Sequence, residues 1–400
     1  MRKVTRSVGQ MEAVLGADPL TEALRGRIQE MILALTEVEL KEVLAARWYE
    51  RSCERRGYRH GSKVRSITTG LGAAVIEWPR ARLIEEGRER EWQSRLIRRY
   101  ERRASSVDCA LLGAYLAGAN GRRIRGALSP LLRGAPLSKS AISRIVGRLQ
   151  ALFCSWRERS LKAFPLAVIY LDAIALRVRI ANKVLSAPVL VALGVGRDGK
   201  KEVLDLELFT SESTSCWSGF VEGLISRGLG RPRLAIIDGS KGLRAAVEQS
   251  WPKVAVQRCT VHKLRNIERH APRHALEEIR SDYHRIIRAG SLDEGRRAYR
   301  EFTSKWKRLA PKVAASLEEG GEELLTFYSF PKSQWKSLRT TNVIERLNGE
   351  FRRRVKTQGS LPDARAAERL LFALLVSGQI HMRRIDGWSA VNQISLSEAA

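Results

Sequence analysis

The chain has 400 residues and a mass of 45.0 kDa, and 44% of its residues are hydrophobic, so two or three domains with buried cores are expected. This composition excludes a disordered chain, a collagen and a disulfide-stabilised scaffold. Lys and Arg number 71 against 43 Asp and Glu, which gives a formal net charge of +28 and predicts a polyanionic partner.

Cysteine usage and hydropathy indicate the compartment. The five cysteines are odd in number and scattered, which favours free thiols in a reducing environment. No apolar stretch approaches the length that a bilayer needs, and the N-terminus lacks a signal-peptide core. We therefore expect a soluble cytoplasmic protein with no membrane partner.

The basic side chains concentrate in three stretches. Residues 51–150 carry 22 basic and 8 acidic side chains, residues 251–310 carry 15 and 7, and residues 331–360 carry 8 and 2. A single such stretch is most simply a solvated surface, but three together favour a nucleic-acid-binding protein.

The first hundred residues predict a helix followed by a small hairpin. Residues 1–50 are nearly neutral, and apolar residues at helical spacing over 20–50 predict a helical lead-in, a candidate dimerisation element. In the basic region 51–105, Val64, Ile67, Val75 and Ile76 flank two glycines and predict a small β-hairpin that Pro79 closes.

Residues 106–152 predict three short helices and favour a helix-turn-helix DNA-binding domain. The first helix of the motif would span 121–132, the turn 133–137, and the helix in the major groove 138–149, with Ser138 as its N-cap. An ordinary three-helix bundle gives a similar pattern, and the surrounding charge is what favours the DNA-binding version. The polar face of the last helix supplies the candidate DNA contacts Lys139, Ser140, Ser143, Arg144 and Arg148.

From residue 160 the pattern changes to strands. Apolar or alternating runs at 166–172 and 175–180, and at 188–195 and 202–209 around Asp198-Gly199, precede a helix at 216–229, a strand at 234–238 and a helix at 241–250. This order is typical of a ribonuclease H-like core with a mixed sheet. The predicted fold class is therefore α/β, with mainly helical DNA-binding domains before the core, the first part of the core at 160–262, an all-α insertion at 263–335, and a last helix at 341–355 within a helical segment 336–390.

Three carboxylates are candidates for chemistry. Asp172 and Asp238 each end an apolar strand, where a carboxylate pays a desolvation cost that a bound cation would relieve. Each would alternatively cap a turn or the following helix. Glu345 lies in the first turn of the last helix and is alternatively the N3 residue of a capping box, with Asn342 as N-cap.

Cys259 and His262 have the spacing of half a zinc site. Only His270 and His274 lie near enough in sequence to complete it, and the spacing matches no common zinc finger. Structural zinc is therefore disfavoured, and a buried cysteine beside a hydrogen-bonded histidine near the active site is favoured.

A long gapped motif runs from Asp238 to His262. It consists of Asp238-x-x-x-Gly242-Leu243, then Ser250-Trp251-Pro252, then Gln257-x-Cys259-x-x-His262. The motif resembles the signature of Mutator-type DDE transposases of bacterial insertion sequences. The resemblance extends over nearly the whole chain, through Arg56-Gly57-Tyr58-Arg59, Trp78-Pro79-Arg80, Leu137-Ser138-Lys139-Ser140, Tyr170-Leu171-Asp172-Ala173, Gly194 to Glu202, Glu212 with Trp217, and Thr340-Thr341-Asn342-Val343-Ile344-Glu345. It departs at Leu204-Asp205, where many relatives have a glycine, and at Ser240, where an apolar residue is usual.

The resemblance implies a function and its residues. Asp172, Asp238 and Glu345 match the family's metal-binding acidic residues, which implies two Mg²⁺ per active site, with Mn²⁺ able to replace them, and Cys259 and His262 match a motif near that site. The implied reaction is two-metal cleavage of DNA at the element ends followed by strand transfer. The implied partners are the terminal inverted repeats and target DNA, held by a homodimer or a larger assembly on the bacterial nucleoid. On the last helix, Arg346, Arg352 and Arg353 are expected to contact phosphates.

Three other functions compete with this prediction. A catalytically silent, transposase-derived DNA-binding regulator would be expected to have lost one of the acidic residues, and all three are present. A ribonuclease H-like nuclease or resolvase would need neither the helix-turn-helix nor the basic N-terminal third. A zinc-dependent regulator built on Cys259 and His262 is disfavoured by their spacing.

Overall fold

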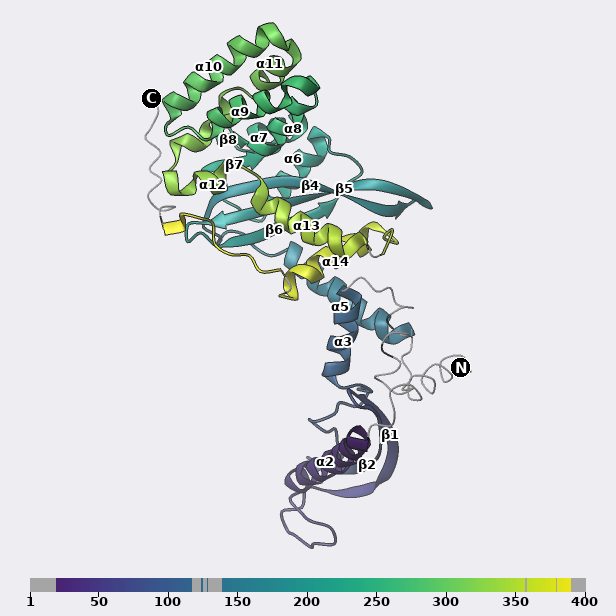
Figure 1. Ribbon diagram of the computed structural model, residues 1–400. Helices are drawn as coiled ribbons and strands as arrows, with labels where there is room; N and C mark the ends of the chain where they lie inside the picture. Colours follow the sequence, from purple (N-terminus) through teal and green to yellow (C-terminus); the bar gives the residue numbers. More distant parts are fainter. Residues whose placement is uncertain are drawn as a thin grey trace. The chain divides into compact units, whose positions relative to one another are not determined.

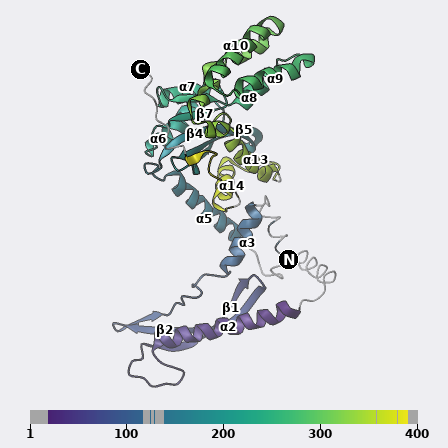
Figure 2. The ribbon, with the colours of Figure 1, turned by 60° about the vertical axis from the view of Figure 1, so that its left-hand side comes forward.

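The computed structural model describes residues 19–116, 124, 128, 139–356, 358–378 and 380–389. The chain divides into two compact units, Met1–Arg148 and Leu149–Ala400. Figures 1 and 2 show the elements of both. Within the described residues no helix combines the length and the apolar character needed to cross a membrane.

The first unit contains a helix packed on a three-stranded antiparallel sheet. Helix α2 (Pro19–Leu44) is the expected helical lead-in, and the sheet has the order β1 (Gly57–Thr69), β2 (Gly72–Glu85), β3 (Arg88–Glu91). Leu40 and Leu44 of the helix form a buried cluster with sheet residues that include Ile76 and Trp78. Trp78 stacks on Trp92 with ring centroids 6.4 Å apart.

This sheet is larger than the hairpin predicted from the sequence, so the described part of the region before the core combines its helices with a substantial sheet. Strands β1 and β2 pair from Gly57↔Leu83 to Thr69↔Gly72, well beyond the apolar residues at 64–76. Much of β1 is exposed and carries polar or basic residues, including His60, Ser62 and Lys63. Strand residues that face solvent give no apolar alternation, and the sequence pattern therefore underestimated the strand length.

One further helix lies in this unit, and another begins in it and continues into the second unit. Helix α3 spans Ser105–Leu116, and α5 spans Lys139–Arg157, eight residues beyond the expected end at 149. Asp108 of α3 pairs with Arg103 and with Arg148, both at 2.8 Å. Apart from residues 124 and 128, the expected first helix and turn of the helix-turn-helix, with Ser138, lie outside the described residues.

The second unit is built on a five-stranded mixed sheet. Its order is β6 (Lys201–Leu208), β5 (Lys183–Gly196), β4 (Leu166–Ile180), β7 (Leu234–Ile237), β8 (Ala255–Arg258). Strands β4, β5 and β6 are antiparallel neighbours, whereas β4, β7 and β8 are parallel. The two runs expected at 166–172 and 175–180 form one strand, so Asp172 lies inside β4 and does not end it. Strand β8 was not predicted, because it has only four residues and no extended apolar run.

Helices cover both faces of this sheet. Helices α6 (Thr214–Ser226) and α7 (Lys241–Ser250) bury Ile169 and Leu171 of β4 in a cluster that also contains Trp217 and Trp251. Both tryptophans fill the core. The alternate side chains of β4 point to the other face, where α13 (Asn342–Lys356) packs against β4, and α14 (Ala364–Val376) packs against β4 and β6.

The chain between β8 and α13 is helical, as predicted, and no strand occurs in residues 259–341, all of which the structure describes. It forms the green helices in Figure 1. The α-helices are α8 (Thr260–Glu268), α9 (Leu276–Ile287), α10 (Leu292–Leu309), α11 (Pro311–Glu318) and α12 (Trp335–Leu338), and the 3-10 turns are η1 (Arg273–Ala275), η2 (Gly321–Leu324), η3 (Thr326–Ser329) and η4 (Lys332–Gln334). Arg258 and Lys263 both pair with Glu319, which ties the end of α11 to the start of α8.

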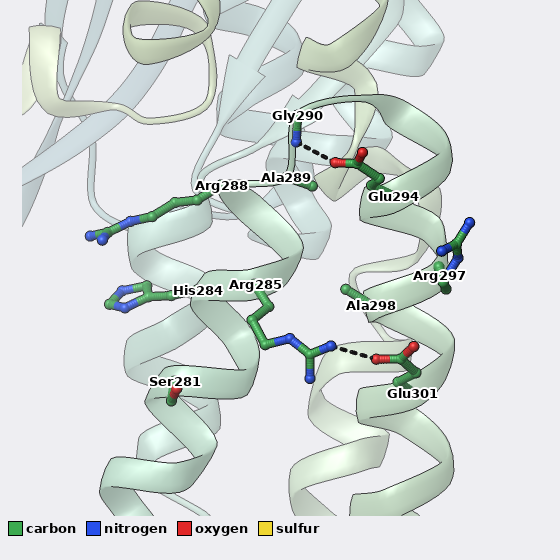
Figure 3. Close-up of a pocket in the computed structure, with 10 residues that line it drawn as sticks. All are labelled: Ser281, His284, Arg285, Arg288, Ala289, Gly290, Glu294, Arg297, Ala298 and Glu301. Atoms are coloured by element: carbon green, nitrogen blue, oxygen red, sulfur yellow. Dashed lines mark hydrogen bonds and ion pairs between the residues drawn. The ribbon is translucent and has the colours of Figure 1, made fainter.

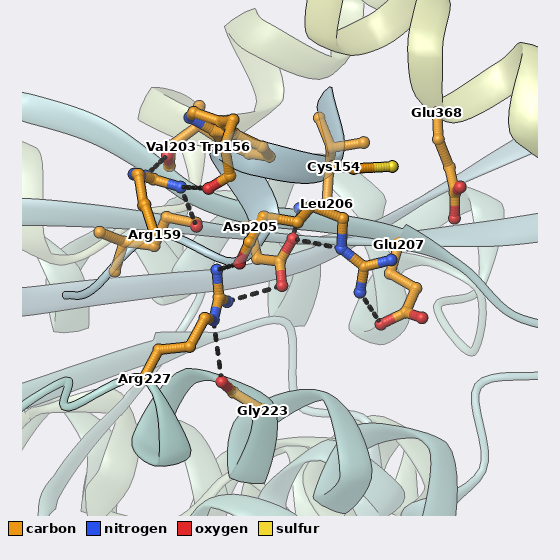
Figure 4. A network of polar contacts seen from close by, with 12 residues as sticks. Cys154, Trp156, Arg159, Val203, Asp205, Leu206, Glu207, Gly223, Arg227 and Glu368 are labelled. Carbon is orange, nitrogen blue, oxygen red and sulfur yellow. Dashed lines mark hydrogen bonds and ion pairs between the residues drawn. The ribbon is translucent and has the colours of Figure 1, made fainter. Parts of the chain in front are cut away.

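A buried ionic network joins α5, β6 and α6 (Figure 4). Asp205 is only 3% exposed and accepts from Arg227 Nη2 at 2.7 Å, with Arg157 Nε at 3.3 Å. Burial raises the pKa of Asp205, and the two guanidinium groups counteract this. The departure from the family pattern at residue 205 is thus a buried charge with its own counter-ions.

Candidate active site

The two aspartates meet where β4 and β7 lie side by side. The parallel register places Leu171 opposite Ile237, so Asp172 and Asp238 are the next residues along neighbouring strands. Asp238 follows the last residue of β7, and its Oδ1 accepts from Ser240 N at 2.8 Å, so the turn-capping role considered for it is real. The turn requires Gly239, whose φ is +98° and where a Cβ would overlap the guanidinium group of Arg258.

Asp172 is the most buried of the three acidic residues. It is 8% exposed, and its Oδ2 accepts from Asn348 Nδ2 of α13 at 2.8 Å. Burial, followed by the negative charges of Asp238 and Glu345, raises the pKa of Asp172 to about 6, while His262 opposes the shift. The charges of Asp238 and Glu345 therefore act on the Asp172 carboxyl group, so the three carboxylates lie in one electrostatic neighbourhood.

Glu345 reaches this neighbourhood from the first turn of α13. Its Oε1 lies 3.2 Å from His262 Nε2, 3.7 Å from Arg265 Nη1 and 3.4 Å from Thr341 Oγ1. The capping-box alternative is wrong in its assignment of the N-cap, because Asn342 is already the first residue of the helix. The Glu345 carboxylate faces α8.

Cys259 and His262 flank this contact at the start of α8. Cys259 is fully buried, and its sulfur accepts from Thr341 N at 3.3 Å and from Thr341 Oγ1 at 3.2 Å. A hydrogen bond and charge from Cys259 raise the pKa of His262 to about 9, and burial partly opposes them. The buried cysteine and hydrogen-bonded histidine beside the acidic residues agree with the sequence interpretation.

The prediction from the sequence did not include two polar residues of the site. Asn348 is completely buried, and its Oδ1 has no hydrogen-bond partner among the described residues. Its position three residues after Glu345 on one helix was the available signal. Glu212 lies close enough to Asp238 that burial and then the Asp238 charge raise the pKa of Glu212.

The structure describes some, but not all, of the side chains that were expected to contact DNA. Arg346, Arg352 and Arg353 are exposed on α13, and Arg353 also pairs with Glu350 at 3.1 Å. The polar side chains expected on α5 divide into Ser143, Arg144 and Arg148, which are exposed, and Lys139 and Ser140, whose side chains lie outside the described residues.

A basic groove of about 660 Å³ lies between α9 and α10 (Figure 3). Within it, Arg285 pairs with Glu301 at 2.8 Å, whereas Arg288 and Arg297 have no carboxylate partner in the part of the chain that the structure describes. Burial and then the positive charges of Arg288 and Arg339 lower the pKa of His284. Three arginines and two glutamates, Glu294 and Glu301, line the groove, so it has a formal excess of one positive charge.

The matches to known proteins each cover most of this chain. Residues 2–383 match the family model described as "Transposase, Mutator family". The transposase for insertion sequence element ISRM5 of Rhizobium meliloti is 34% identical, over 95% of this chain and 92% of that protein. The transposase for IS406 of Burkholderia multivorans is 32% identical over 90% of both, and the one for IS256 in transposon Tn4001 of Staphylococcus aureus is 30% identical over 86% of both. The match to the Drosophila P element transposase strand transfer complex covers 72% of this chain and 84% of that chain, at 10% sequence identity. Its TM-score of 0.31 is too low to support an argument.

Proposed function

The chain belongs to the Mutator family of transposases, and from that premise we propose that it binds the terminal inverted repeats of its insertion sequence, cuts DNA at the element ends and transfers the cut strands to target DNA. The observation that carries the proposal is the convergence of Asp172, Asp238 and Glu345 from β4, β7 and α13. Carboxylates brought together at a cost in solvation are typical of a site that holds cations.

We assign the second unit to the ribonuclease H-like folds. The strand order β6-β5-β4-β7-β8 supports this, with three antiparallel strands followed by two parallel ones. The acidic residues then lie where the parallel strands and the last helix meet, and the all-α insertion precedes that helix.

The residues present fit Mg²⁺, with Mn²⁺ able to replace it. The donors are hard carboxylate oxygens, and the buried Asn348 amide faces Asp172 through its Nδ2 and holds that carboxylate by a hydrogen bond. Asp172, Asp238 and Glu345 would hold two ions. When bound, these ions would activate the attacking water or 3′-hydroxyl and stabilise the leaving oxygen.

The protein's own groups orient this site and bind the substrate. Asn348 fixes the Asp172 carboxylate by its hydrogen bond, and His262 and Arg265 hold the Glu345 carboxylate from the other side. Catalysis in this scheme comes from positioning and charge neutralisation, with no covalent link between protein and DNA.

Basic side chains would bind the DNA. Arg346, Arg352 and Arg353 would contact phosphates beside the acidic residues, and the basic groove between α9 and α10 supports the same polyanionic partner. Helix α5 would contribute base contacts through a helix-turn-helix. Because two element ends must be held together, we propose a homodimer or larger assembly, acting in the bacterial cytoplasm on the nucleoid.

A plasmid that carries this gene with its native flanking DNA tests the proposal. We would incubate it with the purified protein in Mg²⁺ or Mn²⁺ and map nicked 3′ ends, beside Glu345→Gln and a matched control, Glu350→Gln on the same helix. Nicks at the element boundaries that disappear only in Glu345→Gln are expected. Specific binding to the boundaries without nicking in either metal would instead favour the catalytically silent regulator.

A further inference from the structure

The strongest feature that the proposed reaction does not use is a cluster of three different donor groups. A thiol, an imidazole and a carboxylate, from Cys259, His262 and Glu345, offer ligand atoms that all lie within 4.8 Å of one another. The first two come from the start of α8 and the third from the first turn of α13. Among the described residues, this is the group of three or more such donors that is compact enough to surround one ion.

The sulfur of Cys259 is prepared to act as a thiolate. Its two hydrogen-bond donors, the backbone N–H and the hydroxyl of Thr341, both stabilise a negative sulfur. Cys259 is also the N-cap residue of α8, where the helix dipole favours an anion.

The mixture of donors selects a different kind of metal from the one that acidic residues alone would hold. Mg²⁺ takes oxygen ligands and has little affinity for sulfur. Thiolate, imidazole and carboxylate are the three protein ligands that suit Zn²⁺, and sites with three protein ligands leave the fourth position open. The cluster lies beside Thr341, which contacts both Cys259 and Glu345, so the carboxylate is already within reach of the sulfur.

We propose that Cys259, His262 and Glu345 form a binding site for Zn²⁺ or a similar thiolate-binding divalent metal, and that occupation of this site takes up the Glu345 carboxylate that the Mg²⁺ site needs. Such an ion would inhibit the Mg²⁺-dependent reaction. The binding site stands on the geometry alone, whereas the inhibition rests on the proposed function. Sequence spacing disfavoured zinc because it offered only His270 and His274 as further ligands, and neither belongs to the cluster.

Cobalt binding tests the site without DNA or Mg²⁺. The other four cysteines, Cys53, Cys109, Cys154 and Cys216, are exposed or half-buried, so a full-length variant with all four replaced by serine keeps Cys259 as its single thiol. Titration of this variant with Co²⁺ should give a sulfur-to-cobalt charge-transfer band at one ion per chain, and Zn²⁺ should abolish it. Absence of the band would overturn the proposal.

Further variants identify the metal ligands and test whether bound Zn²⁺ inhibits nicking. Adding Cys259→Ser should remove the band, and His262→Ala should weaken Co²⁺ binding by about tenfold or more, since even lost hydrogen-bond partners of ligands cost that much. X-ray absorption of the zinc-loaded single-thiol variant should show one sulfur at about 2.3 Å, and this readout does not depend on a Cys259 substitution. A shell without sulfur would refute the site. Nicking by that variant should be suppressed by Zn²⁺; if Zn²⁺ binds with sulfur but nicking persists, the inhibition is refuted and the site stands.

Discussion

Asn348→Leu removes the hydrogen bond that holds Asp172 while nearly keeping the side-chain volume. The lost bond joins a fully buried amide to a carboxylate that is 8% exposed, at 2.8 Å, and hydrogen bonds to charged groups contribute roughly 1.5–3 kcal/mol. Leucine also removes the orphaned Oδ1, whose burial costs about 1 kcal/mol or more. We therefore expect the free energy of unfolding to fall by only about 1–2 kcal/mol at pH 7.5.

The same substitution should have a larger effect on the response to metal. Without Asn348 the Asp172 carboxylate is no longer fixed, and partners of metal ligands typically contribute about 10–100-fold to metal affinity. The Mg²⁺ concentration for half-maximal nicking should rise by about tenfold or more. The matched control is Asn266→Leu, the same change at a residue that lines the groove between α8 and α11, and it should leave the Mg²⁺ requirement unchanged. An unchanged requirement in Asn348→Leu, with unfolding free energy lowered as expected, would refute the positioning role.

Three further predictions concern stability and DNA binding. Arg227→Met leaves buried Asp205 with Arg157 as its remaining counter-ion. The free energy of unfolding, measured in urea at pH 7.5, should therefore fall by about 2–3 kcal/mol, near the lower end for broken buried pairs. This loss should shrink as the pH is lowered, because burial raises the pKa of Asp205 and a protonated carboxyl needs no counter-ion; a loss that stays constant as the pH falls would contradict that. Arg144→Ala with Arg148→Ala should reduce the preference for element ends in gel-shift titrations, and an unchanged preference would remove α5 from base recognition. The affinity for DNA should fall about 10³–10⁵-fold between about 50 and 200 mM salt, and a flat response would argue against phosphate contacts.

The extent to which the sequence predicted the fold depended on how each element is buried. Helices α6 and α7 and strand β7 pack against the main core, so their apolar periodicity was visible and they were predicted close to their observed bounds. Strand β8 is only four residues long, and the outer half of β4 alternates with exposed arginines, so neither the strand nor the continuity of β4 was evident. The polar face of β1 concealed its length for the same reason.

Some contacts of the candidate site could be predicted from the sequence, and others could not. Asp172 and Asp238 each follow an apolar run, and the two runs pair in parallel register, so the meeting of the two aspartates could be expected even though Asp172 does not end its strand. The contact of His262 with Glu345 spans the all-α segment, and the bond from Asn348 to Asp172 spans most of the second unit. Contacts of this kind depend on tertiary packing and have no local sequence signal.

The central claim is that Asp172, Asp238 and Glu345 act as one site. Its most direct test is the rate of 3′-end release at the element boundaries, measured for Asp172→Asn, Asp238→Asn, Glu345→Gln and the triple variant. Residues that act as a unit are strongly non-additive, so each single variant should be nearly as inactive as the triple one. A single variant that retains full Mg²⁺-dependent cleavage would contradict the claim.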